Sequence, residues 1–238
     1  MAGAIHSTGK KDYTTPDWIL GAVRDFFRDI QRADATDLGI DLDPCSNPQS
    51  TVDAALNLML EEEKVWNSET KQVEIHRNSI LLAQGNWLHD RASNHQGVVP
   101  CWQFGDGLER SWTGLRVYFN PPFGYNKITK LGINDWINKA IEEAAWPQLE
   151  YKNIPEIIGC LPDTPETKPW KNGVLLTAQG RCQLARRVKF GGMKTGIPKP
   201  ISLVYWGQHP EIFKEHFRQF GRVENPSSVY KDQSHIRL

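Results

Sequence analysis

Hydrophobic residues recur at helical spacing near the start of the chain. Between Ile19 and Ile30 they lie three or four positions apart, which predicts a helix that ends at Gln31. Thr15-Pro16 suits its start, because Thr can cap a first turn and Pro fits within one. The same kind of spacing predicts further helices over Val52–Lys64, Asn134–Ala145 and Pro210–Phe220.

Short apolar runs between these segments predict strands. They cover Leu38–Asp43, Leu115–Phe119, Ile154–Leu161, Leu184–Phe190 and Ile201–Trp206. The stretch 65–104 has no clear period apart from strand-like pieces at 71–75 and 79–82, so we interpret it as an insertion. Strands that alternate with helices predict an α/β fold, with a mostly parallel sheet and helices on both faces. We expect one domain over residues 1–238.

Composition excludes several classes of protein. The 238 residues are 39% hydrophobic, which is enough for a core, and no apolar run is long enough to span a membrane. The polar start lacks a signal core, and the four cysteines form no Cys-x-x-Cys pair, which favours reduced thiols in a cytoplasm. We expect no metal site, since the histidines at 76, 89 and 95 are loosely spaced. Phosphate-binding, dinucleotide-binding and serine-nucleophile motifs are missing.

Charge is segregated although the formal net charge is zero. Between Ala33 and Glu63 every charged residue is acidic, whereas between Thr167 and Pro210 every charged residue is basic. The acidic block tolerates a cation such as a sulfonium, and the basic block attracts a phosphate backbone. The alternative is that the two blocks are solvated surfaces that pair with each other.

The tetrapeptide Asn120-Pro121-Pro122-Phe123 follows the predicted strand Leu115–Phe119 and is the strongest candidate site. The Asn side chain and the first Pro carbonyl offer two acceptors, the rings stiffen the turn, and the Phe offers a stacking surface. This combination suits an exocyclic amine on a flat base, such as N6 of adenine. A rigid turn that closes a buried strand is the simpler alternative.

Two acidic motifs are weaker candidates. Asp43-Pro44-Cys45 ends the predicted strand Leu38–Asp43, and Asp106-Gly107-Leu108 precedes the strand Leu115–Phe119. Because ligands bind at the carboxyl ends of strands in open α/β sheets, we expect Asp43 and Asn120 to share one pocket. Each motif alone is also an ordinary turn. Trp18 suits either a stacking surface or the core.

The order of these pieces resembles phage-type DNA adenine-N6 methyltransferases. The similar pieces are Thr15-Pro16-Asp17-Trp18, Asp41–Ser46, Asp106–Trp112, Asn120–Phe123, Gly159–Thr164, Arg187–Phe190 and Ser202–Gly207. The resemblance implies a Rossmann-like methyltransferase fold that uses S-adenosylmethionine to methylate double-stranded DNA, in a bacterial or phage-infected cytoplasm, with a monomer as the default.

The resemblance also implies roles for individual residues. The cofactor would lie against Asp43, Pro44, Cys45, Asp106 and Leu108, and its pocket would be closed by Thr15, Pro16 and Trp18. Asn120 and Pro121 would hold the target amine, Pro122 would stiffen the turn, and Phe123 would stack on a flipped base. Phosphates would be held by Lys168, Arg186, Arg187 and Lys189.

Some features depart from the family pattern. Many amino-methyltransferases carry glycines in the cofactor loop, where this chain has Cys45, Asn47 and Gln49, and Arg186 stands where the family often has Gly. Two alternatives therefore remain open. One is an amino-methyltransferase that acts on RNA or protein glutamine, and the other is an inactive DNA-binding relative.

Overall fold

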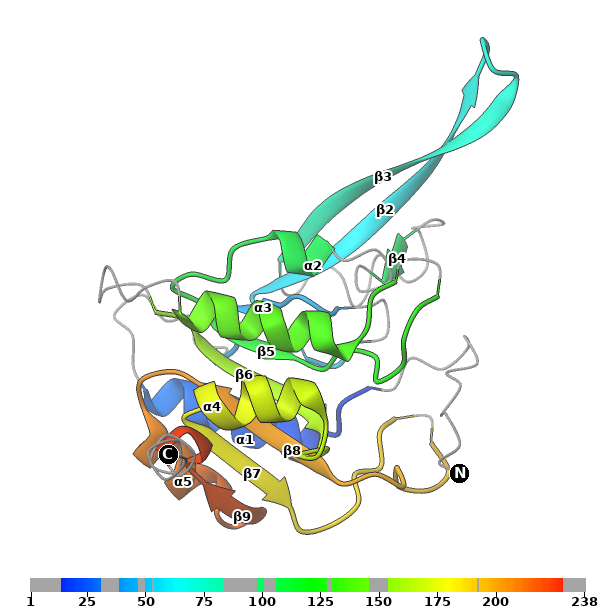
Figure 1. Cartoon of the computed structure of the whole chain (residues 1–238). Helices are drawn as coiled ribbons and strands as arrows, with labels where there is room; N and C mark the ends of the chain where they lie inside the picture. Colours follow the sequence, from blue (N-terminus) through cyan, green and yellow to red (C-terminus); the bar gives the residue numbers. More distant parts are fainter. Residues whose placement is uncertain are drawn as a thin grey trace, which may run out of the picture.

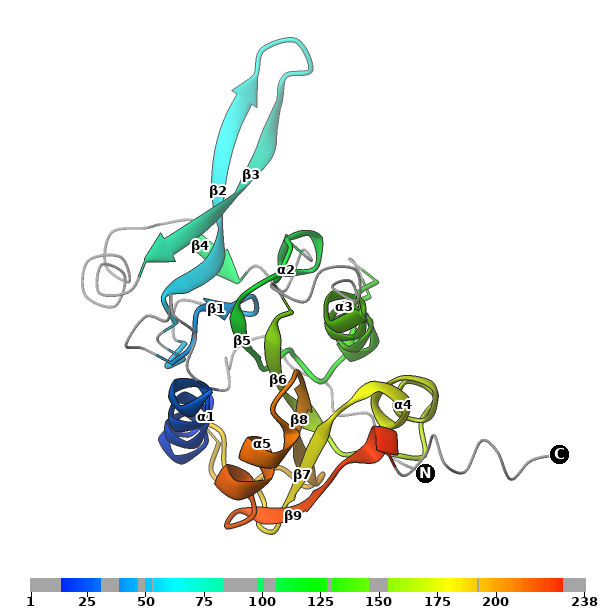
Figure 2. The same ribbon diagram turned by 90° about the vertical axis from the view of Figure 1, so that its left-hand side faces the viewer.

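One mixed sheet with helices on both faces organises the chain (Figure 1 and Figure 2). The structure is a computed structural model, and it describes residues 14–30, 39–46, 50–52, 54–83, 98–100, 106–127, 130–145, 154–191 and 193–228. The expected α/β class is confirmed. In the described part of the chain, no helix has the length and apolar character needed to cross a membrane.

The strands are β1 (Leu42–Asp43), β2 (Leu56–Asn67), β3 (Gln72–Ala83), β4 (Val98–Pro100), β5 (Arg116–Phe119), β6 (Glu156–Pro162), β7 (Gly180–Leu184), β8 (Ile201–Trp206) and β9 (Gly221–Glu224). The helices are α1 (Asp17–Asp29), α2 (Asp106–Glu109), α3 (Ile133–Ala145), the π-helical turn η3 (Trp170–Val174), α4 (Leu175–Thr177) and α5 (Pro210–Phe217).

The strand order is β3-β2-β1-β5-β6-β8-β7-β9, and β4 also pairs with β2. Pairing is parallel between β1 and β2, β1 and β5, and β5 and β6. It is antiparallel between β2 and β3, β2 and β4, β6 and β8, β7 and β8, and β7 and β9. The expectation of a mostly parallel sheet is therefore wrong, because hairpin pairings extend both ends of a parallel centre.

Apolar residues cover the two faces of the sheet separately. On one face, α1 and α5 meet the sheet, and the Phe26 ring lies 5.2 Å from Tyr205 and 5.8 Å from Phe213 between ring centroids. On the other face, α3 and η3 bury Trp136 and Trp170 beside β5, β6 and β8. The predicted helices at 15–31, 134–145 and 210–220 match α1, α3 and α5, because each has an apolar stripe that faces the sheet.

The predicted helix over Val52–Lys64 is wrong, since Leu56–Asn67 forms the strand β2. Leu56 and Asn57 pair with β1, and all of β2 pairs with β3 in a hairpin that projects from the body of the protein (Figure 1). The strand-like pieces predicted at 71–75 and 79–82 fall in β3, apart from position 71. Beyond β1 the hairpin extends roughly 30 Å at about 3.3 Å per residue.

Two other predicted strands differ from the structure. The segment 38–43 contributes only Leu42–Asp43, and position 38 lies outside the described residues. The prediction over Leu184–Phe190 is wrong, because β7 ends at Leu184 and the following residues form no strand. Val188 and Phe190 are buried between exposed basic residues, so the alternation reflects packing of an irregular segment. The strand β9 was not predicted.

Candidate functional site

The order of the sheet reverses at β1. From β1 the chain continues to β2 on one side, and β5 lies on the other side. Such a switch point is where open α/β sheets place ligands, at the carboxyl ends of the strands. Asp43 ends β1 and Asn120 follows β5, so both candidate motifs lie at this point.

A small cavity joins these two motifs. Its volume is about 20 Å³, and it is lined by Thr14, Thr15, Asp43, Cys45, Ser50, Val52 and Asn120. The expected proximity of Asp43 and Asn120 is thus present in the structure, with Thr15 between them in the lining. This volume holds about one water molecule. A larger ligand enters only if surrounding residues move.

Asp43 is a buried carboxylate, with 2% of its surface exposed. Its Oδ1 accepts from the Cys45 backbone N–H at 3.0 Å, and its Oδ2 accepts from the Ser50 hydroxyl at 3.0 Å. Burial outweighs these hydrogen bonds and raises the pKa of Asp43 to about 7. Among the described residues, no Lys, Arg or His forms an ion pair with Asp43. A cationic ligand would therefore favour its charged form.

Asn120 is held by the N-terminal segment. Its Nδ2 donates to the Thr15 hydroxyl at 3.1 Å, and the Tyr118 hydroxyl donates to the same Thr15 oxygen at 3.1 Å. Thr15 does not cap α1, since the N-cap residue is Pro16 and no side-chain cap bond forms. The expectation that Thr15 caps this helix is wrong, because its hydroxyl is engaged by Asn120 and Tyr118.

The Asp-Gly-Leu motif lies against the Asp43-Pro44 turn. A Cβ atom at Gly107 would approach the Pro44 carbonyl oxygen to 2.3 Å, so only glycine fits here. The Trp112 indole N–H donates to the Gly107 carbonyl at 3.1 Å, which fixes the turn from its other side. Leu108 is partly buried, and Asp106 is the first residue of α2, although its side chain lies outside the described part.

The turn after β5 contains two aromatic side chains, one packed against the protein and one exposed. Phe123 is half-buried and meets Phe190 edge-on at 5.8 Å between centroids, while Pro121 is buried and Pro122 half-buried. Tyr125 is 64% exposed and is a large aromatic side chain with no core role. We did not single out Tyr125 from the sequence. Its position two residues after Phe123 was the available signal.

Trp18 lies away from the small cavity. Its ring packs on Phe220 at 5.5 Å, and the Arg186 guanidinium lies over it at 5.0 Å from the centroid. The structure therefore does not bring Trp18 to the pocket that it was expected to close. Pro16 is half-buried at the start of α1 and is not in the cavity lining either.

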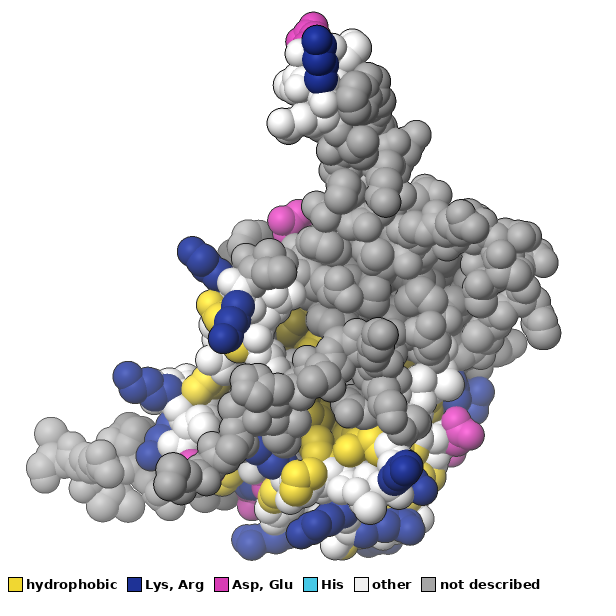
Figure 3. Space-filling view, turned by 90° about the vertical axis from the view of Figure 1, so that its right-hand side faces the viewer, with side chains coloured by type: hydrophobic (Ala, Val, Ile, Leu, Met, Phe, Trp, Pro, Cys, Tyr) yellow, Lys and Arg dark blue, Asp and Glu magenta, His cyan; other side chains and the backbone are white. Residues whose placement is uncertain are grey.

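The basic block is divided between surface and interior. Arg186, Arg187 and Lys189 are exposed on the segment after β7, and Lys168 is exposed before η3. By contrast, Arg181 is 9% exposed and pairs with Asp163 at 2.6 Å, so it is not available to a partner. Figure 3 looks onto the side of the protein toward which β6 and β7 run, and Lys and Arg side chains gather on its lower part.

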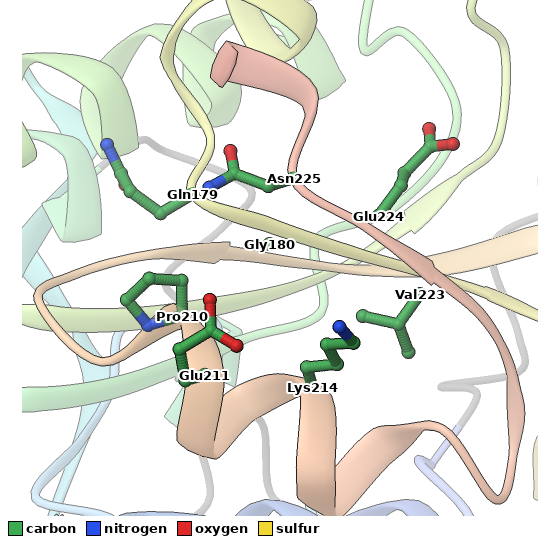
Figure 4. Close-up of a pocket in the computed structure, with 8 residues that line it drawn as sticks. All are labelled: Gln179, Gly180, Pro210, Glu211, Lys214, Val223, Glu224 and Asn225. Carbon is green, nitrogen blue, oxygen red and sulfur yellow. The ribbon is translucent and has the colours of Figure 1, made fainter. Parts of the chain in front are cut away.

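A larger cavity lies elsewhere, between β7, α5 and β9 (Figure 4). It has a volume of about 120 Å³ and is lined by Gln179, Gly180, Pro210, Glu211, Lys214, Val223, Glu224 and Asn225. None of the predicted site residues lines it. Within the described ranges, no cluster of His, Cys, Asp or Glu has a metal-binding arrangement.

No family model, curated protein or solved structure matches this chain.

Proposed function

We propose that the chain is an S-adenosylmethionine-dependent methyltransferase that acts on N6 of adenine in double-stranded DNA. One observation supports this proposal above all: the carboxyl ends of β1 and β5 bring Asp43 and Asn120 into one small polar cavity. The resemblance of the sequence motifs predicts the same pair. Neither a metal nor a covalent enzyme intermediate is needed for the reaction.

The sheet order is compatible with a Rossmann-like methyltransferase fold. β8 is antiparallel to both β6 and β7, so it lies as a reversed strand between two strands that share a direction. The parallel centre with its switch point at β1 supports a ligand site at the same edge as Asn120.

Asp43 and Asn120 suit the two reactants of the proposed reaction, which are the cationic cofactor and the target amine. Asp43 is a buried carboxylate that a cationic ligand would stabilise, and the cofactor supplies an electrophilic methyl group on a sulfonium. Asn120 Oδ1 and the Pro121 carbonyl would accept the two hydrogens of N6. N6 is a poor nucleophile, because its lone pair is delocalised into the ring. Tetrahedral geometry would localise this pair for attack on the methyl carbon. On methyl transfer the sulfonium would become a neutral thioether, and the extra proton of N6 would pass to water.

Access to N6 requires that the base leave the duplex, at a cost of a few kcal/mol. Stacking on an aromatic ring recovers on the order of 1–3 kcal/mol. Phe123 and the exposed Tyr125 are the two aromatic residues in the turn that follows Asn120. Arg186, Arg187, Lys189 and Lys168 would hold phosphates without reading base identity.

Expression in a host that lacks DNA methylation, followed by methylome sequencing, tests the proposal. We expect N6-methyladenine at a defined site, because a positioned amine clamp acts on one base at a time. Methyl groups found only on RNA or on protein glutamine would assign the chain to another substrate class.

The second candidate is a DNA-binding relative without catalytic activity. The small volume of the cavity, about 20 Å³, and the missing loop glycines favour it. Calorimetric titration with S-adenosylmethionine separates the two candidates. Binding with proton release near pH 6 supports the enzyme, because a bound cation lowers the pKa of Asp43. Absence of both heat and thermal shift supports the inactive relative.

A further inference from the structure

Thr15 has an unusual position for a residue that precedes a helix. It is 4% exposed, and its hydroxyl does not cap α1. Instead the oxygen receives two hydrogen bonds from β5 and its end, one from Tyr118 and one from Asn120, both at 3.1 Å. Thr15 is 103 positions from Tyr118 and 105 positions from Asn120, so the contact depends on how α1 is docked against the sheet.

Both hydrogen bonds are donated to the Thr15 hydroxyl oxygen. Burial raises the pKa of Tyr118 well above its ordinary value, so its hydroxyl keeps its proton, and in the structure this hydroxyl donates to Thr15. The Asn120 Nδ2 also donates to Thr15. A hydroxyl oxygen has two lone pairs, and these two donors use both of them. The Nδ2 end of the Asn120 amide is therefore tied to Thr15.

The backbone around Thr15 is held from two further sides. The Thr51 hydroxyl donates to the Thr15 carbonyl at 3.1 Å, and the Gly191 N–H donates to the Thr14 carbonyl at 2.8 Å. Gly191 belongs to the basic segment after β7, and a Cβ there would approach the Thr14 hydroxyl oxygen to 1.9 Å. Thr15 is thus fixed independently of the amide that it contacts, as a positioning group must be.

We propose that Thr15 is the positioning residue of the candidate clamp. Its hydroxyl holds the Nδ2 end of Asn120, so that the carbonyl oxygen of the same amide is left to accept a hydrogen from the target amine. Tyr118 supports Thr15 and acts through it. This inference rests on the proposed function, and it gives Thr15 a role toward Asn120 in place of the cofactor contact expected from the sequence.

Three substitutions test the inference with little change in volume. Thr15→Val removes the hydroxyl, Thr15→Ser keeps it, and Tyr118→Phe removes the donor to Thr15 together with the hydrogen bond between Tyr118 and Cys160. We expect Thr15→Val to lower kcat on the order of 10²-fold, because misplacement of a reacting group has effects of this size. KM for DNA and Kd for S-adenosylmethionine should stay unchanged. Thr15→Ser should restore turnover, and Tyr118→Phe should add no loss to the Thr15→Val variant.

An NMR measurement tests the contact without any turnover. The side-chain amide resonance of Asn120, assigned by its loss in Asn120→Asp, should shift in Thr15→Val and not in Thr15→Ser. Thr177→Val is the matched control, because the Thr177 hydroxyl accepts from the Trp206 indole at 2.9 Å and donates to the Gly173 carbonyl, away from the site.

Three results would overturn the inference: an unshifted Asn120 amide in Thr15→Val, equal losses of kcat in Thr15→Ser and Thr15→Val, or a matching loss of cofactor affinity. A wild-type protein that transfers no methyl group would instead refute the proposed function. The amide resonance would then still decide whether Thr15 holds Asn120.

Discussion

Stability should fall as the pH rises through the range in which Asp43 ionises in the folded protein. Asp43 is 2% exposed, and burial raises its pKa from 3.8 to about 7. The unfolded chain gives this carboxyl its ordinary pKa near 4. Between these values the folded protein binds more protons than the unfolded chain, so the free energy of unfolding decreases from about pH 4 to about pH 7.

The size of this loss of stability follows from the shift in the pKa of Asp43. Each pKa unit corresponds to about 1.4 kcal/mol, so a shift of about three units amounts to ~4 kcal/mol of stability lost when Asp43 ionises. Asp43→Asn keeps the shape and cannot ionise. Relative to this variant, the wild-type protein should lose up to ~4 kcal/mol between pH 4 and pH 8.

Urea unfolding at a series of pH values, followed by circular dichroism, measures this difference. Asp25→Asn is the matched control, because it removes a carboxylate whose side chain is 65% exposed. A constant difference in unfolding free energy between wild type and Asp43→Asn across this pH range would refute the argument. It would mean that Asp43 stays charged in the folded protein.

Two further predictions concern DNA binding and the turn at Gly107. Replacing Arg186 and Arg187 by Ala should lower the slope of log affinity for DNA against log salt by about 1.8, since each phosphate contact contributes about 0.9; an unchanged slope would exclude both residues from phosphate binding. Gly107→Ala should destabilise the protein by about 1–3 kcal/mol in thermal unfolding, because the new Cβ would lie 2.3 Å from the Pro44 carbonyl oxygen. Gly21→Ala, with nothing within 4 Å, should raise stability by about 0.5–1 kcal/mol; equal effects of the two changes would contradict the packing argument.

The elements that were predicted correctly each have an apolar pattern that fits only one kind of secondary structure. Residues 133–145 have one apolar stripe, and Ile201–Trp206 is a run that is buried on both faces of the sheet. Residues 52–64 differ, because Leu56, Leu58 and Leu60 suit the alternation of a strand as well as a helix. Pairing with β1 and β3 decides between these structures, and neither partner is visible in the local sequence.

The candidate site was predictable in part. The rule that ligands lie at strand ends brings Asp43 and Asn120 together from sequence alone. The hydrogen bond from Asn120 to Thr15 joins residues that are 105 positions apart, and it depends on the docking of α1. Trp18 shows the same limit, since its contact with Phe220 requires the positions of α5 and β9, which the sequence does not supply.

Methyl transfer from tritiated S-adenosylmethionine to adenine-containing duplex DNA tests the central claim most directly. The wild-type protein should incorporate label as N6-methyladenine. Asn120→Ala should lower incorporation on the order of 10²-fold while cofactor and DNA binding are retained. Asn225→Ala, which removes a side chain that lines the distant cavity, should leave incorporation unchanged. Equal incorporation by Asn120→Ala and wild type would contradict the account.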